Sequence, residues 1–386
     1  MSWVVAGVLL AAASSPPIVH VGVDLVQVDA TVTDKRGRQV EGLTAADFQV
    51  FEDGKRQEIT HCEYVRVGAP VAAPTETHRT SVATAVAETP APKTVPAVVA
   101  LVIHDYGLDF ANTERVRHSA RRFVDAHADG LTRIAITRTG RGTETRPSFT
   151  TDRALLHAAV DSLEEPPKER MPTVPEDVGQ SRYGPMPGGG NAELMAMWHR
   201  RLMLPNLDGL EAVVAAMASL AGRRSVVLFS DQLSLENHDP DMRKSLDPWV
   251  MEKMERVRER ANRASVVMYT VTTTGLRTFA LTASESRPRH NVRAAMSEEA
   301  FTGLHVLPEA TGGLWLRNTN DLDHALETIA ADQAGYYVLA YTPDESFFER
   351  KDGRPQFRKL KVKVKRGGVT VRSRSGFLGT PDGEAP

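Results

Sequence analysis

The sequence is poor in cysteine, in net charge and in long apolar runs, and each shortage excludes a class of protein. Cys62 is the single cysteine among 386 residues, which excludes an intramolecular disulfide and a cysteine-based zinc cluster. The formal net charge is −2, so whole-protein electrostatics give no reason to expect a nucleic acid or membrane partner. Beyond the first residues, no stretch approaches the roughly 18 apolar residues of a membrane-spanning helix.

The one long apolar run lies at the start of the chain, and we interpret it as a signal peptide over residues 1–13. It ends in three alanines ahead of Ser14-Ser15-Pro16-Pro17, an arrangement that resembles a cleavage site. It carries no Lys or Arg in front of its apolar part, and a buried terminal strand or helix is the alternative. We therefore expect an exported protein, either periplasmic or extracellular.

Two apolar stretches dominate the rest of the chain, and each ends in polar residues. Val98–Ile103 leads into His104 and Asp105, and Ser225–Phe229 leads into Ser230 and Asp231. Such near-continuous apolar runs are typical of buried parallel strands. Helical patterns alternate with them, which predicts an α/β fold over residues 97–343, with a doubly wound, mostly parallel, Rossmann-like sheet. Ligands of such sheets bind beyond the carboxyl ends of the strands.

Local patterns place the other elements of this region. The predicted strands are 133–137, 265–271, 314–317 and 336–341. The predicted helices are 113–127, 152–163, 206–220, 247–263, 298–310 and 321–331. Asp152 and Asn206 are the expected N-caps of the second and third of these helices. Residues 164–190, rich in Pro, Gly and Glu, are expected to form a long insertion.

Smaller β units flank this region. Residues 20–67 carry strand patterns and are predicted to form an N-terminal β unit, which is expected to pack on something else because it is small. Residues 68–96 contain five prolines and no aromatic residue, which is the composition of a linker. Residues 344–378 are predicted to form a basic β-hairpin with strands 360–365 and 369–373, and this hairpin and the N-terminal unit could pack together.

The predicted hairpin is strongly basic. Eleven Lys or Arg and one Asp lie between Arg350 and Arg374, and the alternate positions Lys359, Lys361, Lys363 and Lys365 share one face. The simplest interpretation is a solvated strand face on which lysine protects a sheet edge. The alternative is contact with an anionic surface, such as lipid head groups or acidic polysaccharide.

The order of these patterns resembles a bacterial exported family built on a von Willebrand factor type A domain. The resemblance covers nearly the whole chain after the signal peptide. It rests on Val28–Asp34 with Gly37, Leu43–Phe48, Phe51–Gly54, Gly222–Asp231, Ala310–Gly313, Gly335–Pro343 and Val371–Phe377. It implies the α/β fold described above and a role in protein interaction or adhesion.

The resemblance also implies a metal-ion-dependent adhesion site. Such domains hold a divalent cation with a D-x-S-x-S loop after the first strand, a distant Thr and a distant Asp. Here the loop carries Asp105 and Asp109 but neither serine, residues 190–192 offer no hydroxyl where the Thr would fall, and Asp231 matches the distant Asp. The site is therefore degenerate, and Mg²⁺ or Ca²⁺ is the only cofactor that these three carboxylates suggest.

Catalytic interpretations find little support in the sequence. His104, Asp105 and Ser230 could form a nucleophilic triad, but the chain has no G-x-S-x-G elbow. Gly188–Gly190 lacks the spacing and lysine of a phosphate-binding loop. We therefore expect no catalytic residues and a non-enzymatic protein-interaction or adhesion module with a protein partner. It would bind through residues 104–112, 164–191 and 231–247. A metal-dependent hydrolase that uses Asp105 and Asp231 is the alternative.

The signal peptide interpretation predicts cleavage after Ala13. N-terminal sequencing of the protein from a secreting host should return Ser14 as the first residue, because the three alanines provide the small side chains that the peptidase requires. A mature chain that still begins at Met1 or Ser2 would contradict export by this route.

Overall fold

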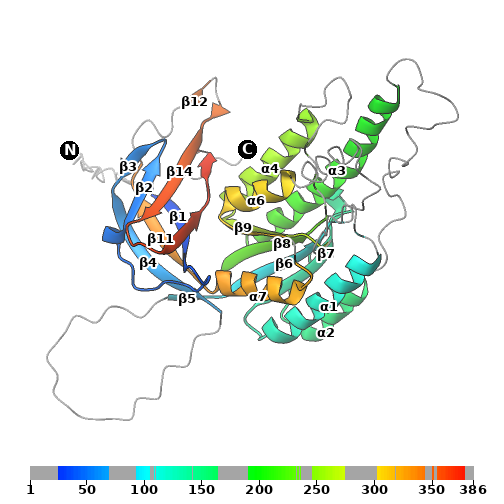
Figure 1. Ribbon diagram of the computed structural model, residues 1–386, viewed down its shortest axis with the longest axis horizontal. Coiled ribbons are helices and arrows are strands. Elements are labelled where there is room, and N and C mark those ends of the chain that lie inside the picture. The colour runs from blue at the N-terminus through cyan, green and yellow to red at the C-terminus, as the bar shows by residue number, and fades with distance from the viewer. Residues whose placement is uncertain are drawn as a thin grey trace, which may run out of the picture.

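Five parallel strands form the sheet that the sequence predicts. Their order is β10 (Trp315–Leu316), β9 (Val266–Val271), β8 (Arg223–Phe229), β6 (Ala97–Ile103) and β7 (Arg133–Arg138) (Figure 1). The computed structural model describes residues 25–68, 93–104, 108, 110–140, 142–163, 190–231, 233, 235, 246–273, 302–317, 319–343, 350–351 and 354–378. Among the helices in these ranges, none combines the length and apolar character needed to cross a membrane.

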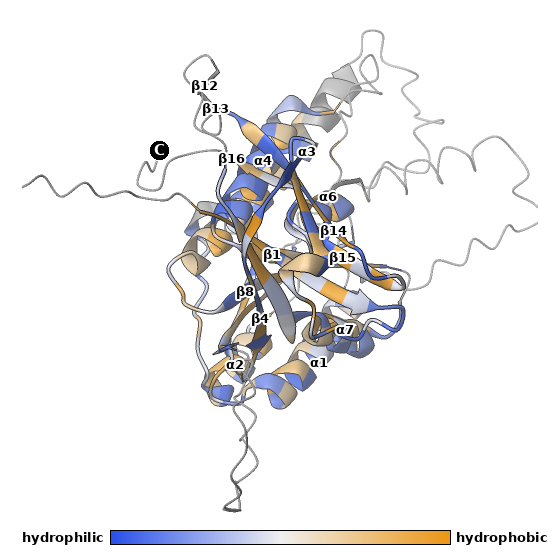
Figure 2. Ribbon diagram, turned by 90° about the vertical axis from the view of Figure 1, so that its left-hand side faces the viewer, coloured by the Kyte–Doolittle hydropathy of each residue, from blue (hydrophilic) through white to orange (hydrophobic). Residues whose placement is uncertain are grey.

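Helices cover both faces of the parallel sheet. One face packs against α3 (Gly190–Met217), α4 (Pro248–Arg263) and α6 (Thr302–Thr311), and the other against α1 (Phe110–His127), α2 (Arg153–Asp161) and α7 (Leu322–Gln333). Because side chains alternate along a strand, Val98, Ala100 and Val102 enter the first core while Val99 and Leu101 enter the second. The predicted doubly wound α/β architecture is confirmed. Figure 2 shows apolar residues concentrated between the layers.

A β-sandwich lies beside the parallel sheet (Figure 1). Its first sheet has the order β15 (Val369–Ser373), β1 (Val26–Asp34), β11 (Gly335–Tyr341), β4 (Ile59–Val67) and β5 (Lys93–Val95). Its second has the order β16 (Gly376–Leu378), β14 (Phe357–Val364), β2 (Phe48–Glu52) and β3 (Lys55–Gln57). Val28, Phe48, Tyr337 and Leu360 meet in the core between the sheets. Short elements complete the fold: η1 (Ala45–Asp47), η2 (Gly142–Glu144), β12 (Arg350–Lys351) and β13 (Arg354–Pro355).

The strand expected over 336–341 forms as β11, but it joins the sandwich rather than the parallel sheet. It pairs antiparallel with β1 on one side and with β4 on the other. Tyr337, Leu339 and Tyr341 are fully buried against the N-terminal strands. An apolar strand pattern predicts burial on both faces but does not specify which strands will be its neighbours, so the sequence alone could not assign β11 to a sheet.

The two C-terminal strands form as predicted but do not pair as a hairpin. β14 pairs with β2 and β16, whereas β15 pairs with β1 in the opposite sheet of the sandwich. The chain turns the corner of the sandwich between them, because the apolar side chains of both strands point into the shared core. The pairing of β14 with β2 also means that the N-terminal and C-terminal β units do pack together.

Two local predictions change with tertiary structure. Asn206 lies inside α3 rather than at its start, and its amide donates to the carbonyl of Leu202 at 2.7 Å. The helix continues through Pro205, so the polar residue that resembles a cap instead bonds back to the helix. Lys93–Val95, at the end of the predicted linker, forms β5 beside β4, and residues 69–92 lie outside the described residues. Asp152 caps α2 as expected, and Asp247, predicted as the first residue of its helix, is the N-cap of α4.

Buried ion pairs join the sandwich to the parallel domain along a boundary that we call the seam. Asp332 of α7, 4% exposed, accepts from the Tyr269 hydroxyl of β9 at 2.8 Å and pairs with Arg372 of β15. Burial, with the adjacent Asp332, raises the pKa of Tyr269 well above its ordinary value, so its hydroxyl remains a donor. Arg223 of β8 pairs with Asp29 of β1 at 2.5 Å.

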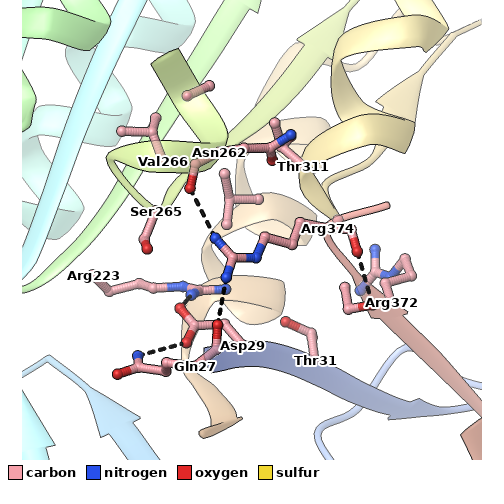
Figure 3. Close-up of a pocket in the computed structure, with 14 residues that line it drawn as sticks. Gln27, Asp29, Thr31, Arg223, Asn262, Ser265, Val266, Thr311, Arg372 and Arg374 are labelled. Carbon is pink, nitrogen blue, oxygen red and sulfur yellow. Dashed lines mark hydrogen bonds and ion pairs between the residues drawn. The ribbon is translucent and has the colours of Figure 1, made fainter. Parts of the chain in front are cut away.

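Figure 3 shows a third contact across the seam. Arg374 donates to the backbone carbonyls of Asn262 in α4 and of Gln27 in the sandwich, at 3.0 and 2.5 Å. Burial lowers the pKa of this guanidinium, and the two carbonyls accept from its two terminal nitrogens. The hollow beside it measures about 20 Å³, which leaves room for little more than a water molecule. The seam is therefore a packed joint rather than a ligand site.

Asp332→Ala should destabilise the whole protein by about 3 kcal/mol or more, because it leaves the buried Arg372 charge without its partner. Urea unfolding measures the change. Glu327→Ala is the matched control on the same helix, since Glu327 is 72% exposed, and it should leave stability unchanged. An Asp332→Ala protein as stable as the wild type would show that this carboxylate does not hold the seam.

Candidate functional site

Buried polar residues gather at the carboxyl ends of the parallel strands, an area that we call the carboxyl edge. His104 follows β6, Ser230 and Asp231 follow β8, and Thr273 follows β9. The chain passes from β6 to β7 on one side and returns to β8 on the other, so β6 and β8 flank the switch point where sheets of this type bind ligands. The four side chains are between 0% and 5% exposed.

Asp231 lies at the centre of a hydrogen-bond network that consists of neutral donors. Its Oδ1 accepts from the backbone N–H of Thr273 at 2.9 Å and from the hydroxyl of the same residue. Its Oδ2 accepts from the Asn112 amide of α1 at 3.2 Å. These donors stabilise the ionised carboxylate without a cation, because hydrogen bonds to the charged form replace part of its lost hydration.

Arg115, one turn further along α1, holds this network in position. Its guanidinium donates to the Asn112 side-chain oxygen at 3.1 Å, which leaves the Asn112 amide nitrogen directed at Asp231. The same group donates to the backbone carbonyls of Thr273 and Asn320 at 2.8 and 2.9 Å. Arg115 therefore links α1 to the two chain segments that follow β9 and β10.

Two further polar pairs lie at this edge, one between two strand ends and one between a strand end and a helix. His104 Nδ1 lies 2.7 Å from Ser230 Oγ, joining the ends of β6 and β8. Thr139, after β7, hydrogen-bonds to the Asn206 side chain of α3. Ser230 is 0% exposed, so its hydroxyl is not presented to a substrate. His104 and Ser230 therefore form the hydrogen bond that a nucleophilic triad would contain, but both residues are buried in the protein interior.

The structure places one of the three predicted metal ligands. Asp231 lies at the carboxyl edge as expected, whereas Asp105 and Asp109 lie outside the described residues. In the described part of the chain, no three His, Cys, Asp or Glu side chains come together as a group that could hold a metal ion. A hard cation requires several oxygen ligands, and around the Asp231 carboxylate the described residues contribute one hydroxyl oxygen, of Thr273, together with an amide N–H and a backbone N–H that donate to the carboxylate.

Large apolar side chains are exposed on α3 and around the start of α4. Met197 of α3, Leu246 just before the N-cap of α4 and Trp249 of α4 are 57%, 47% and 62% exposed. All three lie within one helical turn of the ion pair between Arg200 and Asp247, whose atoms are 2.6 Å apart. Because α4 follows β8, its N-terminal turn lies at the carboxyl edge. We call these three residues the apolar trio.

Sequence reasoning identified Asp231 and missed most of its surroundings. Thr273 and Asn112 follow the same rule as Asp231, since each lies just beyond an apolar strand or at a helix start, but hydroxyl and amide residues are common in loops. Trp249 stands directly after Pro248 at the start of α4, and a Trp on the first turn of a helix is the signal that could have identified the apolar trio.

Comparisons with known proteins do not assign the chain to a family. No family model and no curated protein matches it. An aerotolerance-related membrane protein from Bacteroides fragilis aligns at a TM-score of 0.32 and 11% identity, over 61% of this chain and 98% of that one. BatB from Bacteroides thetaiotaomicron aligns at 0.30 and 13%, over 61% and 98%. The vWF domain of the pilus tip protein Mfa5 from Porphyromonas gingivalis aligns at 0.20 and 21%, over 36% and 38%. The family resemblance therefore continues to rest on the sequence motifs.

Thermal unfolding of the full chain should hardly change between a chelator and millimolar Mg²⁺ or Ca²⁺, because neutral donors already occupy both oxygens of Asp231. An ion at a hundred times its dissociation constant would add about 2.7 kcal/mol and raise the melting temperature by several degrees. If such a rise appears in the wild type and disappears in Asp231→Ala, the carboxyl edge binds a cation and the site is not degenerate.

Proposed function

We propose that this protein is an exported, non-enzymatic interaction module that binds a protein partner at the carboxyl edge. In this proposal the edge is a degenerate metal-ion-dependent adhesion site, in which hydrogen bonds replace the cation around Asp231. The partner then contacts the rim of the edge rather than a metal ion. Export follows from the apolar segment over residues 1–13.

The apolar trio is the observation that carries the proposal. Scattered exposed apolar residues are normal on a protein surface, but three large ones near a polar network are typical of a binding site. Trp249 is the type of residue that contributes most to binding energy in protein interfaces. The other large exposed apolar residues of the described chain, Leu25, Leu131 and Leu155, lie in separate elements or turns.

Binding accounts for the carboxyl edge better than catalysis does. Ser230 is fully buried, whereas a serine nucleophile must reach its substrate. Asp231 accepts hydrogen bonds on both oxygens, so it is poorly placed to bind a metal-activated water. The metal-dependent hydrolase alternative would use Asp231 together with Asp105, which lies outside the described residues, and we therefore rank it second.

Site-specific photo-crosslinking in cells that make the protein tests the proposal. A photoreactive residue at position 249 should give discrete adducts with a partner protein. The same residue at position 155 should give none, because Leu155 is 60% exposed but lies on α2, away from the apolar trio. A partner found in this way should bind Trp249→Ala at least about tenfold more weakly, and Leu155→Ala within about twofold of wild type.

Two results would contradict the interaction module. Adducts at position 155 but not at position 249 would place the interface elsewhere. Hydrolysis of generic ester or phosphate substrates that requires Mg²⁺ and is lost in Asp231→Ala would instead support the metal-dependent hydrolase.

A further inference from the structure

The outer face of the second sandwich sheet carries a row of lysines on β14. Lys359, Lys361 and Lys363, which we call the lysine row, are all exposed and alternate with the buried Leu360 and Val362. Successive members are spaced roughly 6.6 Å apart, as i and i+2 positions of a strand are. The register adds Arg56 of β3 to the same face, because Lys361 lies opposite Phe51 and Phe51 lies opposite Arg56.

Edge protection does not account for the whole lysine row. β16 pairs with β14 only at Phe357–Lys359, whereas Lys361 and Lys363 lie where β2 is the one paired neighbour among the described strands. Lysine is common on an unpaired sheet edge, so this role fits Lys361 and Lys363 but not Lys359. Lysine also has a low strand propensity, and three like charges in a row repel one another.

Nothing in the described residues neutralises the lysine row. None of its three ammonium groups forms an ion pair with a described carboxylate, whereas the neighbouring Arg358 pairs with Asp53 at 3.1 Å. The ammonium of Lys363 instead lies 5.1 Å from the ring centre of Phe51. The ring contact holds this cation above the sheet without removing its charge.

The lysine row borders a hollow of about 630 Å³ between the sheet face and α4. Phe51 and Phe357 line it together with the three lysines and Arg258 of α4. The guanidinium of Arg258 lies 4.6 Å above the Phe357 ring, and Arg258 pairs with Glu255. The hollow is within the size range of ligand sites, and its charge is predominantly positive.

We propose that this face binds an acidic polysaccharide, with chain carboxylates paired to the lysine row. A linear polyanion matches a row of cations that continues along the strand, and its hydroxyl groups stay hydrated on an open face. The match is one of charge complementarity, since the three lysine ammonium groups form no ion pair with a carboxylate of the described residues. This surface is separate from the apolar trio, so the proposal does not depend on the function proposed above.

Three other anionic partners fit the face less well. An acidic peptide would use its backbone to extend a sheet edge, and β16 already occupies this edge at Phe357–Lys359, which leaves only a short stretch of β14 for such pairing. Single-stranded nucleic acid would need open ring faces for base stacking. Lys363 covers Phe51, and Phe357 lies between Arg258 and Gly376. A lipid bilayer is flat, whereas these cations border a hollow.

Fluorescence anisotropy with labelled polygalacturonate tests the proposal on the full chain. The triple variant Lys359→Gln, Lys361→Gln and Lys363→Gln should bind at least about tenfold more weakly than wild type. The control triple variant Lys35→Gln, Arg36→Gln and Lys93→Gln removes the same charge from exposed positions elsewhere and should stay within about twofold. Wild-type binding should weaken with salt, and labelled neutral dextran should not bind.

Several outcomes would overturn the proposal. Equal loss in both triple variants would mean that net charge alone drives binding, and no binding beyond that of dextran would remove the site. Tighter binding to oligo-deoxythymidine, or to vesicles of equal parts phosphatidylglycerol and phosphatidylcholine, lost in the first variant, would assign the face to nucleic acid or membrane. If that variant fails to melt cooperatively, Lys361→Gln alone should weaken polygalacturonate binding about threefold, and Lys361→Arg should restore it.

Discussion

The buried carboxylate of Asp332 is the contact on which the arrangement of the two layers depends. It belongs to the last turn of α7, and the chain enters the sandwich at Gly335, only three residues later. Its hydrogen bond to Tyr269 and its ion pair with Arg372 therefore fix a helix, a parallel strand and a sandwich strand at one point. Apolar residues in place of a buried ion pair can stabilise a protein as much as the pair itself does. We therefore infer that the Asp332–Arg372 pair contributes mainly by fixing the orientation in which the sandwich docks on the parallel domain.

β14 keeps an exposed outer face in that orientation. At the carboxyl edge, the donors to Asp231 come from two elements, so the network forms only when α1 and the segment after β9 are in place. Trp249, at the start of α4, is exposed. The lysine row differs, since its charges remain without carboxylate partners. The apolar trio is suited to burial against an apolar surface, and the lysine row to long-range electrostatic attraction of an anion.

The candidate site was predictable in location and only partly in composition. Asp231 could be placed at the end of its strand because an apolar run followed by polar residues marks a carboxyl end. Its partners could not, because Asn112 and Thr273 are separated from it by 119 and 42 positions in the chain. The His104–Ser230 contact could not be predicted for the same reason, because its two residues lie at adjacent strand ends but are 126 positions apart in the chain.

The sequence by itself determined the features that depend on neighbouring residues: the buried strands 98–103 and 225–229, the cap Asp152, and the α/β alternation. Periodicity and capping act over a few residues, so they can be read locally. Tertiary structure alone decided that β11 belongs to the sandwich, and that β14 and β15 occupy opposite sheets. The physical reason is that strand partners are selected by packing between residues far apart in the chain, such as Ala30 with Tyr337, and a strand pattern carries no record of its partner.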